Sequence, residues 1–331
     1  MVDIMEYDFQ PIELWKARQR IKPFVLRTPL VYSRALSERT GSEIYLKMEC
    51  WQKHGCFKVR GATNFLASMS DAERQKGLVT ASSGNHAIAL SYAASLFGNP
   101  PTYVFLPETA DKAKIAKIES FGVQAVLFGK NFLETLDRAT AFAEEKGATY
   151  VHSHAVPRII AGQGTIGLEI LEDLPDLDTV IVPVGGGGIL AGISMAIKTA
   201  APSVKVIGAE PAASPGAFMS MRDGIARERI ELKPSLADGL SGGTSPFPFK
   251  LFHDKVEKII LLEENEIAYA MRIFQQDEQI MVEGAACVGL ATLLSGKLSL
   301  PGEKIVLILT SRNINAERYN RVVAGEPVEV K

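Results

Sequence analysis

Three separate stretches of the sequence carry residue types that could act together in catalysis. The first, Gly55–Ala62 (GCFKVRGA), places Lys58 directly after an aromatic residue and before an apolar segment. The second is Ser82–His86 (SSGNH) and the third is Gly185–Gly188. A lysine that is desolvated in an apolar cleft has a lowered pKa and becomes a nucleophile toward carbonyl groups. Taken alone, Lys58 is more simply a solvated surface cation, so its interpretation depends on the other two stretches.

The four consecutive glycines at 185–188 indicate a phosphate site. They follow an apolar, β-branched segment at 179–183 and precede a helical pattern at 189–200. Backbone N–H groups without side chains can converge on an anion at the start of a helix. A flexible turn is the alternative, but an interior turn rarely needs four glycines. The pattern is neither the P-loop nor the spaced GxGxxG fingerprint, which argues against a nucleoside triphosphate and weakly against NAD.

A phosphate cradle combined with a nucleophilic lysine suits an aldehyde that carries a phosphate. Pyridoxal phosphate is such a compound, and from the residues alone it is one candidate among several phosphorylated ligands. Ser82–His86 also lies at a strand-to-helix switch, where hydroxyls, backbone N–H groups and the Asn85 amide could bind a carboxylate or a ring oxygen. An ordinary capped helix is the simpler interpretation of that segment, and His86 could equally be a structural histidine in the first helical turn.

The elements that must position these stretches alternate between strand and helix patterns. This βαβα order predicts parallel sheets with right-handed crossovers. Residues 211–250, rich in Gly, Pro and Ser, are expected to form loops and short helices over the site. The expected strands lie at 43–48, 78–81, 102–106, 123–128, 179–183, 204–209 and 306–309, and the main expected helices at 61–69, 87–97, 112–121, 131–145, 157–174, 189–200, 266–275 and 284–298.

Length and composition restrict the class of protein. A chain of 331 residues suggests two domains. The net charge of −2, without long runs of either sign, argues against nucleic acid or an anionic membrane as the main partner. Neither a signal peptide nor an apolar run of about 20 residues is evident. Three scattered cysteines indicate neither a disulfide framework nor a zinc site, so a reduced, cytoplasmic protein is expected.

GCFKVRGA closely resembles the GSFKxRGA lysine motif of the serine/threonine dehydratase and serine racemase branch of pyridoxal-phosphate enzymes. Four later stretches are similar to that family's successive signatures, in the family's order and over nearly the whole chain. These stretches are Ala81–His86, Ala161–Thr165, Gly185–Gly188 and Leu236–Gly239. The resemblance implies the tryptophan-synthase-β-like fold (fold type II).

That fold is α/β, with two domains that are each an open, mostly parallel, twisted sheet with helices on both faces. The resemblance implies a discontinuous cofactor-binding domain at 1–65 and 151–331 and a small mobile domain at 66–150. It also implies a homodimer. Because the chain ends at residue 331, we expect no C-terminal regulatory domain of the kind that some threonine deaminases carry.

The resemblance also assigns roles to individual residues. Lys58 would form the Schiff base with pyridoxal 5′-phosphate and later move the substrate's α-proton. A hydroxyl facing the pyridine nitrogen, as at Thr310, would keep the ring a mild electron sink, which suits β-elimination. The implied cofactor-binding residues are Phe57, Lys58, Asn85, Gly185, Gly186, Gly187, Gly188, Gly239, Glu283 and Thr310. The implied substrate carboxylate site is Ser82, Ser83, Asn85 and His86.

Several positions depart from the family's pattern. Cys56 replaces a serine and His54 a common threonine, and both could alter the leaving-group end of the pocket. Arg312 stands where glycine is common, and the run at 241–246 is also unusual. The metal site of some relatives would draw on Glu210, but the following Ser-Pro-Gly offers no second carboxylate, so we expect no metal.

The function that these residues favour is a lyase that converts a β-hydroxy amino acid, such as threonine, serine or a 3-substituted serine, to a 2-oxo acid and ammonia. Ser83 occupies the position of the acid/base of serine racemases, so it is a second catalytic candidate and racemisation is an alternative. An enzyme of hydroxyectoine breakdown is another alternative. A β-replacing synthase fits less well, because it carries Ser-Gly-Asn-Thr, and a non-catalytic amino-acid sensor fits least.

Overall fold

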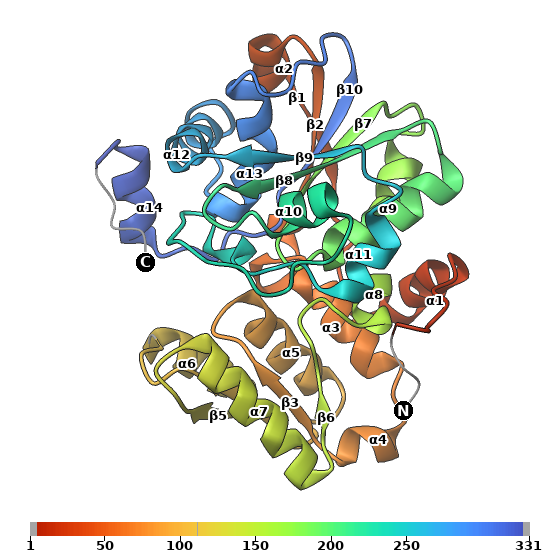
Figure 1. Ribbon diagram of the computed structural model, residues 1–331, viewed down its shortest axis with the longest axis vertical. Coiled ribbons are helices and arrows are strands. Elements are labelled where there is room, and N and C mark those ends of the chain that lie inside the picture. Colours follow the sequence, from red (N-terminus) through yellow and green to blue (C-terminus); the bar gives the residue numbers. More distant parts are fainter. Residues whose placement is uncertain (1–4, 111, 327–331) are drawn as a thin grey trace.

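The computed structural model describes residues 5–110 and 112–326, which are built around two sheets (Figure 1). The larger sheet has six strands in the order β1-β2-β10-β7-β8-β9, all parallel to their neighbours except β1, which is antiparallel to β2. Its strands are β1 (Leu30–Ser33), β2 (Glu43–Lys47), β7 (Thr179–Pro183), β8 (Lys205–Pro211), β9 (Lys258–Leu262) and β10 (Lys304–Ile308).

Both faces of the six-stranded sheet are covered by helices. Successive side chains of a strand point to opposite faces, so Val180 and Val182 enter one core cluster while Ile181 enters the other. The first face packs against α1 (Ile12–Ile21), α8 (Pro157–Asp173), α9 (Gly188–Ala200) and α11 (Pro246–Phe252). The second packs against α2 (Arg34–Thr40), α12 (Glu264–Ile273), α13 (Gly284–Leu294) and α14 (Ala316–Val323).

The smaller sheet has four parallel strands in the order β5-β4-β3-β6. Helix α7 covers one face, and α5 and α6 cover the other together with α3 (Lys58–Ala67). We call this sheet and α4–α7 the four-stranded part, and the rest of the chain apart from α3 the six-stranded part. The elements of the four-stranded part are β3 (Leu78–Ala81), β4 (Thr102–Leu106), β5 (Gln124–Leu127), β6 (Thr149–Tyr150), α4 (Asp71–Gln75), α5 (Asn85–Leu96), α6 (Lys112–Glu119) and α7 (Phe132–Lys146).

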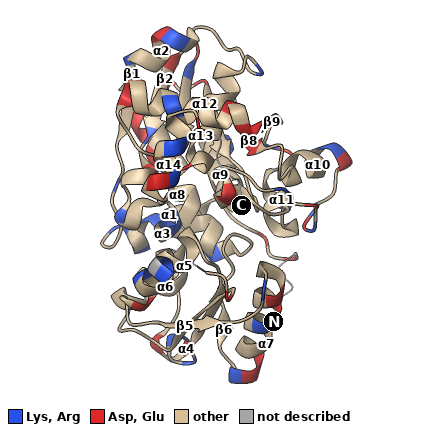
Figure 2. Ribbon diagram, turned by 90° about the vertical axis from the view of Figure 1, so that its left-hand side faces the viewer, with Lys and Arg blue, Asp and Glu red and all other residues tan. Residues whose placement is uncertain are grey.

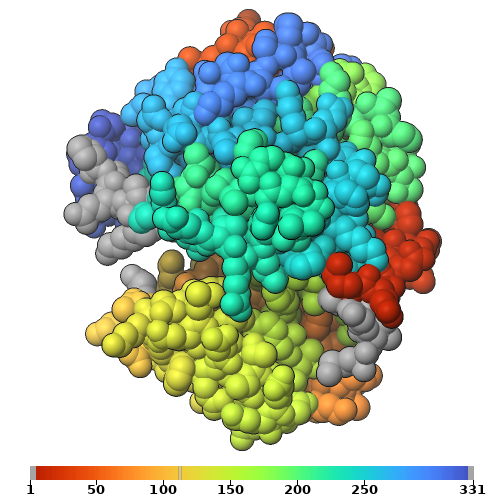
Figure 3. All heavy atoms as spheres, in the orientation of Figure 1, coloured from red at the N-terminus to blue at the C-terminus, as the bar shows by residue number. Residues whose placement is uncertain are grey.

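Helix α3 lies between the two parts and packs against both α8 and α5. The approach to α8 is close, because a Cβ atom on Gly162 would lie 2.6 Å from the Arg60 carbonyl oxygen. Seen as spheres, a groove opens between the four-stranded part and the loops above it on the left of the view (Figure 3). Residues of both charge signs are scattered along the ribbon (Figure 2), in keeping with the net charge of −2.

The predicted α/β fold with two mostly parallel sheets is confirmed. The sequence reading placed the starts of two helices too late, since α3 begins at Lys58 rather than Gly61 and α5 at Asn85 rather than Ala87. The expected strands did not include β1, β6 or β9, and the expected helices did not include α4 or α14. Within the described residues, no helix is both long and apolar enough to cross a membrane.

Candidate active site

Lys58 is the first residue of α3, and strand pairing holds the segment before it in place. Beyond β10 the chain continues beside residues 56–57, where Phe57 donates its N–H to the Thr310 carbonyl (3.0 Å) and Cys56 forms a β-bridge with Ser311. The Lys58 Nζ donates to the Ser153 carbonyl at 3.0 Å. Burial lowers the pKa of Lys58 to about 8, although nearby Cys56 and Glu283 oppose the shift. At pH 7 about a tenth of this amine is therefore uncharged, far more than for an ordinary lysine.

The glycine loop lies between β7 and α9 and has no room for side chains. A Cβ atom on Gly186 would lie 2.1 Å from His154 Nε2, and one on Gly185 would lie 3.0 Å from the Leu240 backbone. Gly187 has φ +93°, a conformation that other residues rarely adopt. His154 is held over the loop by Ser245, whose Oγ lies 3.0 Å from His154 Nε2. The loop thus presents bare backbone at the start of a 13-residue helix, which suits an anion.

Three histidines surround this region, and burial lowers the pKa of each. The pKa falls to about 3 for His86 and about 4 for His152, and it lies well below the ordinary value for His154. The nearby Lys58 charge contributes to every shift. All three rings are therefore neutral at physiological pH and act as hydrogen-bonding groups, not as cations.

Asn85 and Glu283 meet at the centre of a partly buried polar network. Asn85 Nδ2 lies 3.1 Å from Glu283 Oε1 and 3.1 Å from Ser311 Oγ, while Asn85 Oδ1 accepts from Asn313 Nδ2 at 2.7 Å. Burial raises the pKa of Glu283 to about 7, and Asp238 adds to this effect while bonds from Ser311 and Asn85 oppose it. Gly239 lies beside the same carboxylate, because a Cβ there would be 3.1 Å from Glu283 Oε1.

The site meets the demands of a phosphorylated pyridine aldehyde. Thr310 Oγ1 is buried and has no hydrogen-bond partner in the described part of the chain, as expected of a hydroxyl that pairs with a ring nitrogen. Thr244, whose methyl group packs beside Gly187, likewise has a buried, unpartnered hydroxyl. These two hydroxyls, the bare glycine loop and the amine of low pKa together fit pyridoxal phosphate.

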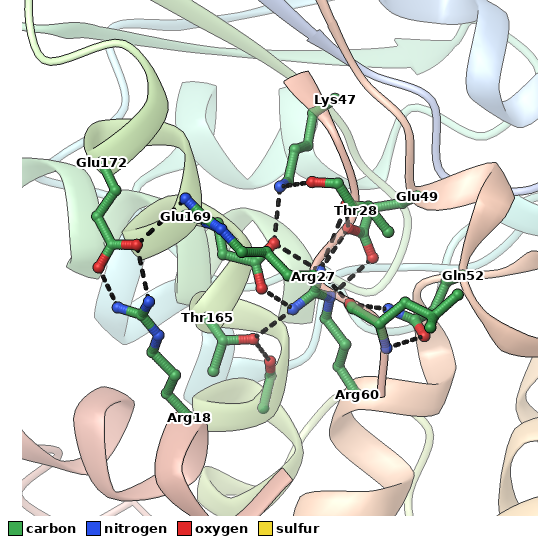
Figure 4. Close-up of polar contacts among 12 residues, drawn as sticks. Arg18, Arg27, Thr28, Lys47, Glu49, Gln52, Arg60, Thr165, Glu169 and Glu172 are labelled. Carbon is green, nitrogen blue, oxygen red and sulfur yellow. Dashed lines mark hydrogen bonds and ion pairs between the residues drawn. The ribbon is translucent and has the colours of Figure 1, made fainter. Parts of the chain in front are cut away.

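Helix α3 is anchored by buried ion pairs two residues after Lys58 (Figure 4). The fully buried Arg60 guanidinium bridges Glu49 (Nη2–Oε1 2.7 Å) and Glu169 (Nη1–Oε1 2.7 Å). Lys47 on β2 pairs with the same Glu169 (2.7 Å) and donates to the Thr28 carbonyl. Because these partners belong to the six-stranded part, the first turn of α3 is fixed to that part.

The structure brings Lys58, Asn85, Gly239 and Glu283 together with the glycine loop. The ring of His86 is different: its Nε2 is 3.1 Å from the Val151 carbonyl, so only its backbone N–H, in the first turn of α5, is left for a carboxylate. Sequence reasoning assigned no role to several polar residues of the site, although Thr244 and Ser245 lie in the unusual run at 241–246 and Ser311 and Asn313 flank Arg312. The residues without an assigned role are His152, Ser153, His154, Thr244, Ser245, Ser311 and Asn313.

The departures from the family pattern occupy defined places. The Cys56 thiol is fully buried, 3.8 Å from the Asn85 carbonyl, and burial raises its pKa to about 12. Arg312 is exposed, with its Cγ against Gly55. Glu210 caps α10 (Gly216–Asp223) by accepting the N–H groups of two residues in its first turn. No group of three or more His, Cys, Asp or Glu side chains in the described ranges is arranged to hold a metal ion.

Comparison with known proteins gives one consistent family. The chain is 44% identical over 312 residues to an L-threonine ammonia-lyase of Thermotoga maritima, covering 94% of this chain and 77% of that protein. It is 38% identical over 314 residues to the catabolic L-threonine dehydratase of Escherichia coli K12, covering 94% of each. The solved structure of maize serine racemase superimposes with a TM-score of 0.88 at 31% identity, covering 96% of this chain and 98% of that one.

The predicted family resemblance, fold and cofactor are thereby confirmed. The family match spans residues 21–311, which include the lysine segment, the glycine loop and Thr310. The chain belongs to the family of pyridoxal-phosphate dependent enzymes.

Proposed function

We propose that this protein is an ammonia-lyase that converts a β-hydroxy amino acid, such as L-threonine or L-serine, to a 2-oxo acid and ammonia. The proposal rests chiefly on Lys58. Its amine has a pKa of about 8 and lies in the same site as the glycine loop Gly185–Gly188. The similarity to an L-threonine ammonia-lyase at 44% identity over 94% of the chain supports the same reaction.

Bound pyridoxal phosphate supplies the electron sink that makes the substrate's α-proton acidic. Lys58 then removes that proton, because an uncharged amine of pKa about 8 can both accept and return it near neutral pH. Loss of the β-hydroxyl group follows, and hydrolysis of the resulting enamine and imine gives the 2-oxo acid and ammonia. The Ser153 carbonyl, 3.0 Å from Nζ, holds the amine in place.

The other residues of the site bind and orient the substrate and the cofactor. The first turn of α5 offers its backbone N–H groups to the substrate carboxylate, together with Ser82 and Ser83. Gly185–Gly188 would receive the cofactor phosphate, and Phe57 would pack against the cofactor ring. Asn85 would donate to the phenolic oxygen of the cofactor, with Gly239 and Glu283 beside it.

The proposed enzyme has a small mobile domain and assembles as a dimer. The four-stranded part corresponds to the small mobile domain at 66–150, and the cofactor-binding domain comprises 1–65 and 151–331. Two copies form a homodimer, and the enzyme acts in the cytoplasm on a small-molecule substrate, without a metal. Size-exclusion chromatography with light scattering measures the assembly directly.

Incubation with L-threonine, L-serine and 3-substituted serines tests the reaction, with 2-oxo acid and ammonia measured independently. We expect equal amounts of the two products from at least one compound and none from the Lys58→Ala variant. Absence of 2-oxo acid with every compound, in protein that has bound its cofactor, would overturn the proposal.

Racemisation is a second candidate, favoured by Ser83 and by the similarity to maize serine racemase. A partly exposed hydroxyl at the start of α5 could deliver a proton to the face of the α-carbon opposite Lys58. Chiral analysis of the remaining amino acid detects this activity. The Ser83→Ala variant should lose the opposite enantiomer and retain elimination.

A further inference from the structure

His54 adopts a backbone conformation that is uncommon outside glycine, although histidine tolerates it better than most residues. Its φ of 58° and ψ of 18° lie in the left-handed region, which non-glycine residues seldom occupy unless their surroundings hold them there. It lies four residues before Lys58, in the loop that leads from the six-stranded part into α3. The contacts of His54 should therefore explain what keeps this turn in place.

The imidazole ring belongs to a three-ring cluster, His54, Tyr92 and Phe121. The His54 centroid lies 4.3 Å from that of Tyr92 and 4.9 Å from that of Phe121, and the latter two are 6.2 Å apart. Tyr92 belongs to α5 and Phe121 follows α6, so both come from the four-stranded part. The cluster therefore ties the loop before Lys58 to the opposite part of the molecule.

The charges around the cluster favour an uncharged His54 ring. Burial lowers the pKa of His54, and the cations of Lys117 and Lys53 lower it further. The Nζ of Lys53 lies 5.8 Å from the centre of the Tyr92 ring. At neutral pH the imidazole thus packs as a neutral aromatic ring, so a phenyl ring can replace it in this role.

The backbone carbonyl of His54 points toward the site. It accepts a hydrogen bond from Asn313 Nδ2 at 2.9 Å, and the same nitrogen donates to Asn85 Oδ1 at 2.7 Å. Since Asn313 thereby presents its NH₂ group to Asn85, the Asn85 oxygen must face Asn313. The Asn85 NH₂ group is then directed toward Glu283 and Ser311.

We propose that His54 is a positioning residue for Asn85. The three-ring cluster holds the left-handed turn, the turn aims the carbonyl at Asn313, and Asn313 fixes the amide orientation of Asn85. This extends the proposed function, because Asn85 could donate to the cofactor's phenolic oxygen only with its amide in this orientation, by turning to the cofactor one of the N–H groups that bond Glu283 and Ser311 here. The usual threonine of the family has no ring, so this chain has its own way of fixing the loop.

The test separates the ring from the backbone conformation. His54→Asn removes the ring but tolerates left-handed φ, whereas His54→Phe keeps an uncharged ring and tolerates that φ less well. His253→Asn, which alters an exposed histidine 5.4 Å from Phe249, is the matched control. Hydrogen exchange at the amides of residues 52–58 and 85–91 is measured in cofactor-free protein, and the dissociation constant of pyridoxal phosphate by titration of its visible absorption.

We expect His54→Asn to speed exchange in both segments and to weaken cofactor binding on the order of tenfold, the size of a lost aromatic contact. His54→Phe and His253→Asn should stay within about threefold of the parent protein. Unchanged exchange in His54→Asn, or equal damage from Asn and Phe, would overturn the proposal. If His54→Asn does not fold, Phe121→Leu removes the cluster from the other side and must reproduce the faster exchange at 52–58.

The exchange measurement requires neither cofactor nor substrate. A protein that eliminates no hydroxy amino acid but shows the expected exchange pattern would refute the proposed function alone. A fully active protein with unchanged exchange in His54→Asn would refute the positioning role alone.

Discussion

Replacement of Arg60 by methionine should expose how strongly the buried ion pairs stabilise the fold. The guanidinium is completely buried and contacts two carboxylates, Glu49 and Glu169, at 2.7–2.9 Å. With Lys47, the cluster holds two positive and two negative charges, so it is neutral. Arg60→Met retains most of the side-chain volume but leaves two carboxylates facing Lys47 alone, which is a net buried charge of −1.

The magnitude follows from the burial of that charge. Breaking a buried pair by removing one partner costs about 3–5 kcal/mol. For a chain of 331 residues the entropy of unfolding is about 0.7 kcal/mol/K, so we expect the midpoint of thermal unfolding to fall by about 4–7 °C. Burial alone would raise the pKa of Glu169, yet Arg60 and Lys47 hold it below its ordinary value.

The pH dependence of this loss has a definite sign. A carboxylate with a depressed pKa stabilises the fold above its unfolded pKa, and that contribution is lost as the pH falls through the folded value. Without Arg60, the pKa of Glu169 rises and the group can take up a proton instead of remaining charged. The deficit of Arg60→Met should therefore shrink between pH 7.5 and pH 5.

A double variant makes the measurement decisive. Arg60→Met combined with Glu49→Gln restores a neutral cluster, so calorimetry should show it unfolding at a higher temperature than Arg60→Met alone. Arg34→Met, which breaks an exposed pair with Glu38, is the matched control and should shift the midpoint by less than about 1 °C. If Arg60→Met shifts it no more than this control, or if the double variant is not more stable than the single one, the reasoning from buried charge is wrong.

Three further predictions concern the cofactor site. Only the uncharged amine attacks an aldehyde, so the rate at which cofactor-free protein takes up pyridoxal phosphate should rise from pH 7 to pH 9. Its midpoint should lie near 8, the pKa of Lys58, when uptake is followed by absorbance. A rate independent of pH over this range contradicts that role. Gly186→Ala forces a methyl group into His154 and should weaken cofactor binding at least about tenfold, with far-UV circular dichroism unchanged. Thr310→Val removes a buried, unpartnered hydroxyl, so it should raise the free energy of unfolding of cofactor-free protein by about 1 kcal/mol while weakening cofactor binding; a destabilised cofactor-free protein would mean that the hydroxyl is already paired.

Local sequence patterns were sufficient to predict most elements of the fold. Ser33 accepts from the Leu36 N–H and Gly41 ends α2 in a left-handed conformation, as their residue types predict. Asn131 caps α7 in the same way. Helix α3 was placed three residues late because Lys58 and Arg60 interrupt its apolar pattern, although Arg60 is buried through ion pairs that no local pattern reveals.

The site was predicted unevenly for a similar reason. The residue types and spacing of Lys58 and Gly185–Gly188 indicate directly a Schiff-base lysine and a phosphate site. Ser153, by contrast, acts through its backbone carbonyl, which any residue could supply, and Asn313 acts through a bond to a residue 228 positions earlier. Such roles depend on the tertiary fold that brings β3 and β10 to the same site, so the sequence carries no signal for them.

Cys56, His54 and Arg312, where this chain departs from the family's pattern, pack around the backbone that surrounds the site. The Cys56 thiol is buried against the Asn85 carbonyl, and its pKa of about 12 keeps it protonated and unreactive. His54 packs its ring into the four-stranded part, and Arg312 lies against Gly55 at the surface. All three surround the segment that carries Lys58 and reach the chemistry through Asn85 or through the loop backbone. Substitutions at these three positions should therefore change the affinity for the cofactor before they change the substrate specificity.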